Sequence, residues 1–221
     1  MKLAIVYTGT TKELVEMVEG EVRKRFEGEK LELLHYEAPD VIADVKEKGY
    51  VSAAMKERLL RLYETAGEQA KLLFHICSSV REAAEEAKPL LEKRGVRLVH
   101  FDERMLQTMT ERYERLGLMG TLGTALGATR RYVEQYAEKI GKQPELTEYL
   151  VESSFGLGQK ELGERCLDVI QREALLEAVI LVQGSMACVE EELTRELGIP
   201  VVSGLEFGVE ELWEAYKSYE H

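Results

Sequence analysis

The chain has 221 residues, of which 29 are Lys or Arg and 41 are Asp or Glu, so its formal net charge is -12. This charge would repel the phosphates of nucleic acids and the surfaces of anionic membranes, and we expect neither as a partner. The apolar stretch at the N-terminus is too short for a signal peptide, and no run of about 18 apolar residues occurs. We therefore expect a cytoplasmic globular protein.

Short apolar runs alternate along the chain with segments of helical period, which is the pattern of strand–helix units on a parallel sheet. Helices fill most of the gaps between the runs, and a last helix is predicted over residues 206–219. Strands are predicted at residues 2–7, 31–36, 71–77, 96–101, 117–121, 147–152, 178–183 and 200–203.

The second half of the chain repeats the pattern of the first. "AIVYTGTTKELVEMVEGEVRKR" matches "GLMGTLGTALGATRRYVEQYAEKI", and "LLFHICSSVREAAEEAKPLLEKRGVRLV" matches "AVILVQGSMACVEEELTRELGIPVV". The register places Thr8 opposite Thr121, Cys77 opposite Gln183 and Ser79 opposite Ser185. We predict an α/β fold of two similar flavodoxin-like or Rossmann-like lobes, with parallel sheets related by pseudo-two-fold symmetry. The first lobe takes residues 1–103 plus 205–221, and the second takes residues 104–204.

Four junctions between a strand and a helix are candidates for ligand binding, because ligands of open α/β sheets bind at the carboxyl ends of the strands. If the two lobes face each other, these junctions converge on one cleft. They are Thr8 to Thr11, Cys77 to Ser79, Thr121 to Thr124, and Gln183 to Ser185.

Cys77 is the strongest candidate for a reactive group. A thiol at the start of a helix lies beside unpaired N–H groups and the positive end of the helix dipole, so we expect a lowered pKa and a role as base or nucleophile. The structural alternative is a small apolar residue that closes a strand. His75 shares one face of the strand with Cys77 and could tune the thiol, but a hydrogen-bonded core histidine is the favoured interpretation.

For the other two cysteines, the sequence favours a packing role over a catalytic one. Cys166 lies on the apolar face of a predicted helix with Leu162 and Val169. Cys188 comes five residues after the predicted strand end at residue 183, where packing is favoured although the thiol could reach the cleft. Three cysteines without metal-ligand spacing argue against both a disulfide framework and a metal site.

The loop "YTGTTKE" offers backbone and hydroxyl donors that suit a phosphate or a carboxylate. It is superficially similar to a flavodoxin phosphate loop, which would imply bound FMN, and simple helix capping by Thr10 or Thr11 is an equally good reading. The duplicate loop "GTLGTALGAT" favours a ligand with two anionic groups.

Several motifs in order resemble the aspartate/glutamate/hydantoin racemase superfamily over nearly the whole chain. They are "ICSSV", "FDERMLQTM", "GLMGTLGTALGAT", "LVQGSMA" and "GIPVVSG". The resemblance implies a catalytic Cys77, no cofactor, and a small carboxylate-bearing substrate. The substrate contacts that it implies lie in the two threonine loops, at Thr8, Thr10, Thr11, Thr121 and Thr124. Ser78, Ser79 and Ser185 are further predicted contacts because of their place at the strand–helix junctions.

The chain departs from that family at two positions. The usual C-N-[ST] motif reads Cys77-Ser78-Ser79, and the chain contains no asparagine at all. In two-cysteine members of the family the second thiol ends a strand of the second lobe, and here that position is Gln183. Gln183 can hydrogen-bond an oxyanion but cannot exchange protons at neutral pH.

Racemisation without a cofactor needs one group to remove the α-proton and another to return it on the opposite face. We expect an isomerase or racemase-type enzyme, or a related lyase or tautomerase, that acts at the carbon α to a carboxylate with Cys77 as acid–base thiol and Gln183 as a second catalytic contact. Cys188 and His75 stay open as a second proton donor. The alternative is a catalytically silent small-acid-binding protein of the same fold. A homodimer is expected as the commonest oligomer.

Overall fold

The computed structural model describes residues 1–170 and 175–219. The chain forms two compact units, Met1–Phe101 together with the segment from Leu205, and Asp102–Gly204. Asp102 and Glu103, which the sequence assigned to the first lobe, lie in the second unit. Residues 171–174 and 220–221 of the two predicted lobes lie outside the described residues.

The first unit is built on a sheet of four parallel strands in the order β2-β1-β3-β4. Their bounds are β1 (Lys2–Tyr7), β2 (Glu32–Glu37), β3 (Leu72–Ile76) and β4 (Arg97–His100). Every residue of β3 is buried, which is typical of a parallel strand that helices cover on both faces. β3 thus lies between two other strands, and the segment that follows it begins at the carboxyl end of a buried strand.

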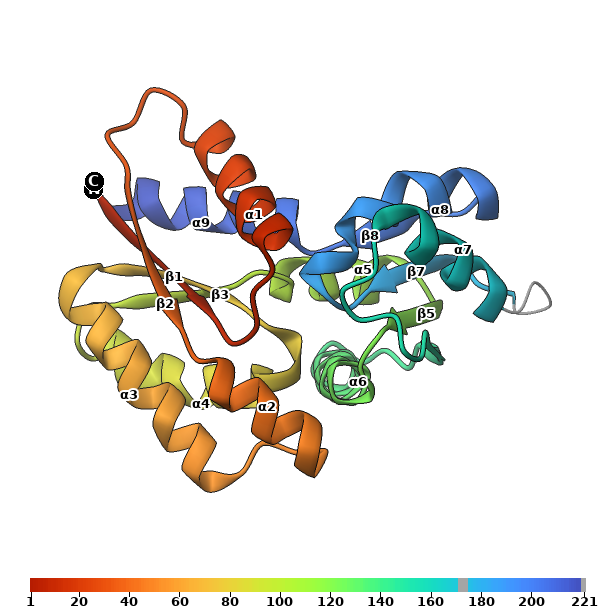
Figure 1. The fold of residues 1–221 in the computed structure, drawn as a ribbon, viewed down its shortest axis with the longest axis horizontal. Coiled ribbons are helices and arrows are strands. Elements are labelled where there is room, and N and C mark those ends of the chain that lie inside the picture. Colours follow the sequence, from red (N-terminus) through yellow and green to blue (C-terminus); the bar gives the residue numbers. More distant parts are fainter. Residues whose placement is uncertain (171–174, 220–221) are drawn as a thin grey trace. The chain divides into compact units, whose positions relative to one another are not determined.

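Helices cover the two faces of this sheet, as Figure 1 shows. One face packs against α2 (Pro39–Lys48), α3 (Ala53–Gln69) and α4 (Arg81–Glu92), and the other against α1 (Lys12–Arg25) and α9 (Leu205–Tyr219). Side chains alternate along each strand, so that Leu73 contacts the first group of helices and Phe74 the second. Cys77 packs on the same side as Leu73.

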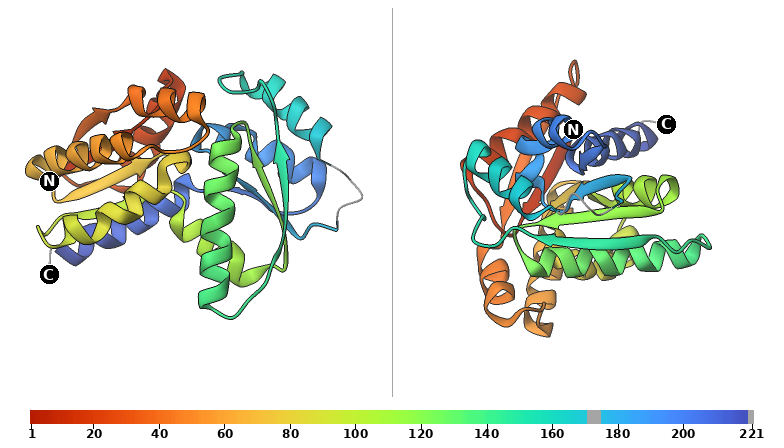
Figure 2. Two further views of the ribbon diagram at one scale, coloured as in Figure 1. Left: turned by 90° about the horizontal axis from the view of Figure 1, so that it is seen from below. Right: turned by 90° about the vertical axis from the view of Figure 1, so that its right-hand side faces the viewer.

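The second unit repeats this topology with four parallel strands in the order β6-β5-β7-β8. Their bounds are β5 (Arg115–Gly120), β6 (Glu145–Leu150), β7 (Ala178–Leu181) and β8 (Val201–Ser203). One face packs against α7 (Gln159–Val169), the 3-10 helix η2 (Gly184–Val189) and α8 (Glu190–Leu197). The other face packs against α5 (Glu103–Arg112) and α6 (Gly123–Lys139), and the right-hand view of Figure 2 shows α6 running alongside β5 and β6.

The shared strand order confirms the predicted α/β fold of two similar parallel-sheet units. β1 corresponds to β5 and β3 to β7, so the register that the repeat predicted pairs equivalent strand ends. The units also exchange one helix: α5 follows β4 but packs in the second unit, and α9 follows β8 but packs in the first. Within the described residues, no helix combines the length and the apolar character that crossing a bilayer requires.

Candidate active site

Cys77 lies directly after β3 and before the 3-10 helix η1 (Ser78–Val80), which continues into α4. Its backbone is extended, with φ -168° and ψ 115°, while Ser78 and Ser79 behind it are buried. The backbone N–H groups of Ser79 and Val80 donate toward the sulfur. The turn from strand to helix therefore presents the thiol to backbone N–H donors at the start of a helix.

The expectation of a lowered pKa for Cys77 is wrong. Burial raises the pKa of this thiol, because packed protein replaces the water that would solvate the thiolate. The Thr8 hydroxyl, the two backbone N–H groups and the charge of Lys46 act in the opposite direction but do not overcome this effect. Cys77 is only partly buried, so water still reaches part of the residue. At neutral pH the group is mainly a thiol, which can give a proton and becomes a base as the pH rises.

The three threonines of the first loop have different partners. Thr8 is 1% exposed, and its hydroxyl faces the Cys77 sulfur without a nitrogen or oxygen partner among the described residues. Thr10 Oγ1 lies 3.5 Å from the Glu37 carboxylate, to which it donates. Thr11 Oγ1 accepts from the N–H of Leu14 at 3.2 Å and caps α1. The fold therefore brings Thr8 to the thiol, whereas the Thr11 hydroxyl caps α1 and the Thr10 hydroxyl is hydrogen-bonded to the Glu37 carboxylate.

Two buried histidines contact the backbone carbonyl of Cys77. The Nε2 atoms of His75 and His100 lie 3.1 and 3.2 Å from the Cys77 carbonyl oxygen. His75 is thus a hydrogen-bonded core histidine, and its ring contacts the backbone of Cys77. Sequence reasoning passed over His100, although the parallel register of β3 and β4 pairs it directly with His75. A histidine at the same position of the next predicted strand was the available signal.

In the second unit Gln183 takes the place that Cys77 has in the first. Gln183 is 8% exposed, and its Oε1 accepts from the Thr121 N–H at 2.6 Å and from the Thr121 hydroxyl at 3.0 Å. A backbone N–H can only donate, so the atom that faces it must be the amide oxygen, and the amide NH₂ must point the other way. No described residue accepts a hydrogen bond from that NH₂. The pair Thr121–Gln183 thus mirrors the pair Thr8–Cys77.

The remaining candidates of the second unit lie around the same strand ends. Thr124 is in the first turn of α6, and Ser185 is in η2. The Cys188 thiol donates to the Ser185 carbonyl oxygen at 3.5 Å, and burial raises its pKa. Cys166 is fully buried in the core, and burial raises its pKa to about 12. Cys166 therefore serves to pack the core, and the raised pKa of Cys188 disfavours its thiolate form.

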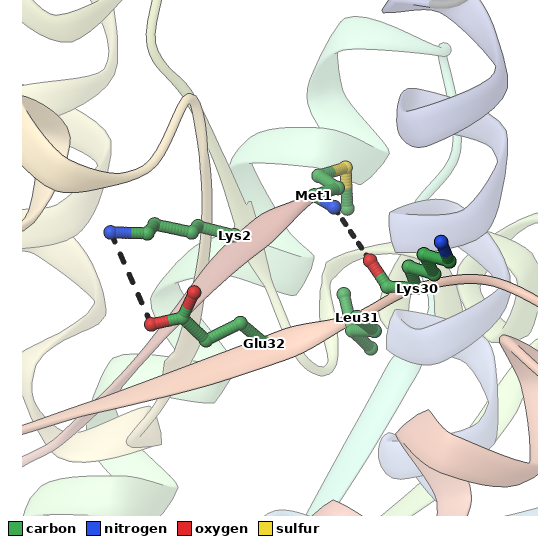
Figure 3. A pocket seen from close by; sticks show the side chains of 5 residues that line it. All are labelled: Met1, Lys2, Lys30, Leu31 and Glu32. Atoms are coloured by element: carbon green, nitrogen blue, oxygen red, sulfur yellow. Dashed lines mark hydrogen bonds and ion pairs between the residues drawn. The ribbon is translucent and has the colours of Figure 1, made fainter.

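A shallow hollow of about 380 Å³ lies at the opposite edge of the first sheet, where the strands begin. It is lined by Met1, Lys2, Lys30, Leu31 and Glu32. Figure 3 shows the N-terminal amine hydrogen-bonded to the Lys30 carbonyl and Lys2 paired with Glu32. None of the residues that line the hollow is a cysteine or a histidine. Across residues 1–170 and 175–219 no three His, Cys, Asp or Glu side chains are grouped as metal ligands.

The family model of the Asp/Glu/Hydantoin racemases matches residues 3–212. The chain belongs to this family. Because the match spans both units, it includes Cys77 and Gln183 alike. No curated protein matches the sequence itself.

Solved racemase and isomerase structures share the fold at low sequence identity. A glutamate racemase of Bacillus anthracis is 12% identical with a TM-score of 0.73, over 98% of this chain and 82% of that one. An allantoin racemase of Klebsiella pneumoniae is 18% identical with a TM-score of 0.62, over 98% and 88%. A maleate isomerase of Pseudomonas putida is 9% identical with a TM-score of 0.68, over 98% and 93%. At these identities the similarity establishes the racemase/isomerase fold.

Proposed function

We propose that this member of the Asp/Glu/Hydantoin racemase family is a cofactor-independent isomerase that acts at the carbon α to a carboxylate of a small acid. The observation that carries the proposal is the environment of Cys77, where a thiol at the end of β3 meets the Thr8 hydroxyl and the N–H groups of Ser79 and Val80. These donors stabilise the thiolate that proton abstraction needs. Cys77 is the proposed acid–base group.

Removal of an α-proton leaves a carbanion whose charge moves onto the neighbouring carboxylate oxygens. Hydrogen-bond donors that await this charge lower the barrier, and a missing donor typically costs about 10²-fold or more in rate. We assign this task to the amide NH₂ of Gln183, which Thr121 orients through the amide oxygen. Ser78, Ser79, Thr124 and Ser185 are proposed as further contacts to substrate oxygens.

A one-sided reaction fits this set of groups better than a symmetric racemisation. Gln183 does not titrate, and Cys188 lies in η2 with its thiol bonded to Ser185. A raised pKa keeps Cys77 protonated at neutral pH, so it can deliver a proton to a carbanion formed by a lyase or a tautomerase step. We therefore include these reactions within the proposed class.

The fixed side chain of Gln183 also favours a second candidate function, that of a binding protein. Its side chain is fixed by Thr121 and supplies hydrogen bonds without proton transfer, as a binding protein would require. A catalytically silent small-acid-binding protein would retain affinity for a dicarboxylate with no turnover, and Cys77→Ser would leave that affinity unchanged.

The test is the incorporation of deuterium at the α-carbon in D₂O, screened over amino acids, hydantoins and 2-substituted dicarboxylates. Wild type is compared with Cys77→Ala, and Cys188→Ala is the matched control because it removes a half-buried thiol elsewhere in the chain. We expect exchange in wild type and in Cys188→Ala, and its loss in Cys77→Ala. Equal exchange by wild type and Cys77→Ala would overturn the role given to Cys77, and loss in Cys188→Ala would make Cys188 the second acid–base group.

A further inference from the structure

A chain of buried hydrogen bonds ends on the carbonyl oxygen of Cys77. Tyr63 Oη lies 3.1 Å from His75 Nδ1, and an Nη of Arg81 lies 3.0 Å from His100 Nδ1. The Nε2 atoms of the two histidines then converge on Cys77 O, at 3.1 and 3.2 Å. Each of these side chains is at most 1% exposed. Their rings also pack together, with the two imidazole centroids 5.0 Å apart.

Donor and acceptor chemistry fixes the proton on each imidazole. A guanidinium can only donate, so Arg81 requires His100 Nδ1 to accept, and the ring proton must be on Nε2. A carbonyl oxygen can only accept, so His75 must likewise carry its proton on Nε2, and its Nδ1 accepts from the Tyr63 hydroxyl. Both lone pairs of the Cys77 carbonyl are therefore filled by neutral Nε2–H groups.

We infer that His75 and His100 are positioning residues for the Cys77 thiol: their Nε2–H groups pin the Cys77 carbonyl and so hold the sulfur against its donors. The carbonyl and the Cβ of one residue share the Cα, so a fixed peptide plane at φ -168° and ψ 115° also fixes the Cα–Cβ bond. That bond directs the sulfur toward Thr8 and the N–H groups of Ser79 and Val80. Without the pin the strand end can rotate, and the sulfur loses its contacts.

Burial above all keeps both imidazoles neutral, because the packed interior cannot solvate an imidazolium. Burial, with the positive charges of Arg81 and Lys88 on α4 as lesser causes, lowers the pKa of His75 to about 3 and that of His100 well below its usual range. Glu85, also on α4, pairs with both of these cations, at 3.8 and 2.9 Å. The positive charge of Lys46 on α2 acts on the Cys77 thiol. At neutral pH the histidines are therefore neutral Nε2–H donors to Cys77 O.

The inference deepens the role proposed for Cys77, but its test reads the thiol itself and needs no substrate. The variants are His100→Leu, which removes the donor, and His100→Gln, whose amide NH₂ can occupy the position of Nε2. The same pair is made at His75. His35, an exposed histidine on β2 of the same unit, gives the control His35→Gln. The pKa of Cys77 is measured from the rate of its alkylation against pH, with mass spectrometry of the peptide that contains it.

We expect the pKa of Cys77 to rise by about one unit in the His→Leu variants, which leaves about tenfold less thiolate at neutral pH. His→Gln should restore the pKa to within a few tenths of a unit, and the control should not change it. A purely structural role would lower thermal stability in the Leu variants without moving the pKa, and that result would overturn the inference.

Imidazole nitrogen NMR of the wild-type protein provides a second measurement that does not depend on how well the variants fold. We expect two histidines with the proton on Nε2 and no titration between pH 5 and pH 8. Protonation of either ring in that range, or a proton on Nδ1, would overturn the inference. Failure of deuterium exchange with an intact response of the pKa would instead refute the proposed function alone.

Discussion

Thr8→Val should make the Cys77 thiol less acidic without weakening the fold. Valine keeps the shape of threonine and removes only the hydroxyl that faces the sulfur. Thr8 is 1% exposed, and its hydroxyl has no nitrogen or oxygen partner among the described residues, so little stabilising energy is lost with it. We expect the free energy of unfolding to change by less than about 1 kcal/mol.

The expected change in the thiol follows from the strength of a hydrogen bond to a charged group. Such a bond contributes about 1.5 kcal/mol, and about 1.4 kcal/mol corresponds to one pKa unit, so the pKa of Cys77 should rise by about one unit. At neutral pH the thiolate fraction then falls about tenfold. A more basic thiolate is a better nucleophile by about threefold per unit, so the net rate of attack on a small disulfide should fall about threefold.

The assay is the rate of exchange of Cys77 with a small disulfide from pH 6 to pH 11, located by mass spectrometry. Above the pKa of both proteins the variant should react about threefold faster than wild type, so the two pH profiles should cross. Thr129→Val is the matched control, because Thr129 is a fully buried threonine on α6 of the other unit whose hydroxyl also has no partner among the described residues. Coincident profiles for Thr8→Val and wild type would refute the contact between Thr8 and the thiol.

Three further predictions concern the fold and the second unit. Gly208→Ala should destabilise the protein by about 3 kcal/mol in chemical denaturation, because a Cβ there would overlap the backbone of Phe101, whereas Gly20→Ala in α1 meets nothing within 4 Å and should stabilise by up to about 1 kcal/mol. His75 has a folded pKa of about 3 against an ordinary value of 6.5, so the unfolded chain binds more protons between these values; His75 alone should reduce stability by about 1.4 kcal/mol per pH unit as the pH drops from 6.5 towards 3, in addition to the contribution of His100, and His75→Gln should remove the part due to His75. Gln183→Cys would give the second unit a titratable thiol, and chiral chromatography should then detect racemisation of a substrate found by deuterium exchange; a folded variant that leaves one enantiomer unchanged would contradict the assigned equivalence with Cys77.

The sequence alone was sufficient for the architecture. A parallel strand buried on both faces must be apolar along its whole length, and this requirement makes runs such as residues 72–76 visible without a structure. The repeat between the halves then determined the pairing of strand ends, and the two sheets have the same strand order. The position of Cys77 after a strand and before a helix is likewise a local property of the chain.

Tertiary structure decided the chemistry of the thiol. Local reasoning sees only the helix start, which lowers the pKa of Cys77, but burial depends on everything that packs around the residue and reverses the direction. In the same way, three threonines of one loop look alike in sequence, and only the fold separates Thr8, which faces the sulfur, from Thr10 and Thr11.

The sequence by itself determined where the strands end and therefore which residues lie at those ends, because local periodicity and the repeat reveal the strands and helices. What only the tertiary structure decided is how those side chains are held. His75 and His100 meet on one carbonyl because β3 and β4 are neighbours in the sheet, although the two histidines are far apart in the chain. The orientation of the Gln183 amide is likewise set by a tertiary contact. The backbone N–H of Thr121, at the end of another strand, donates to the amide oxygen, so the NH₂ group points the other way. Hydrogen bonds of this kind depend on distance and direction in space, which local periodicity does not encode.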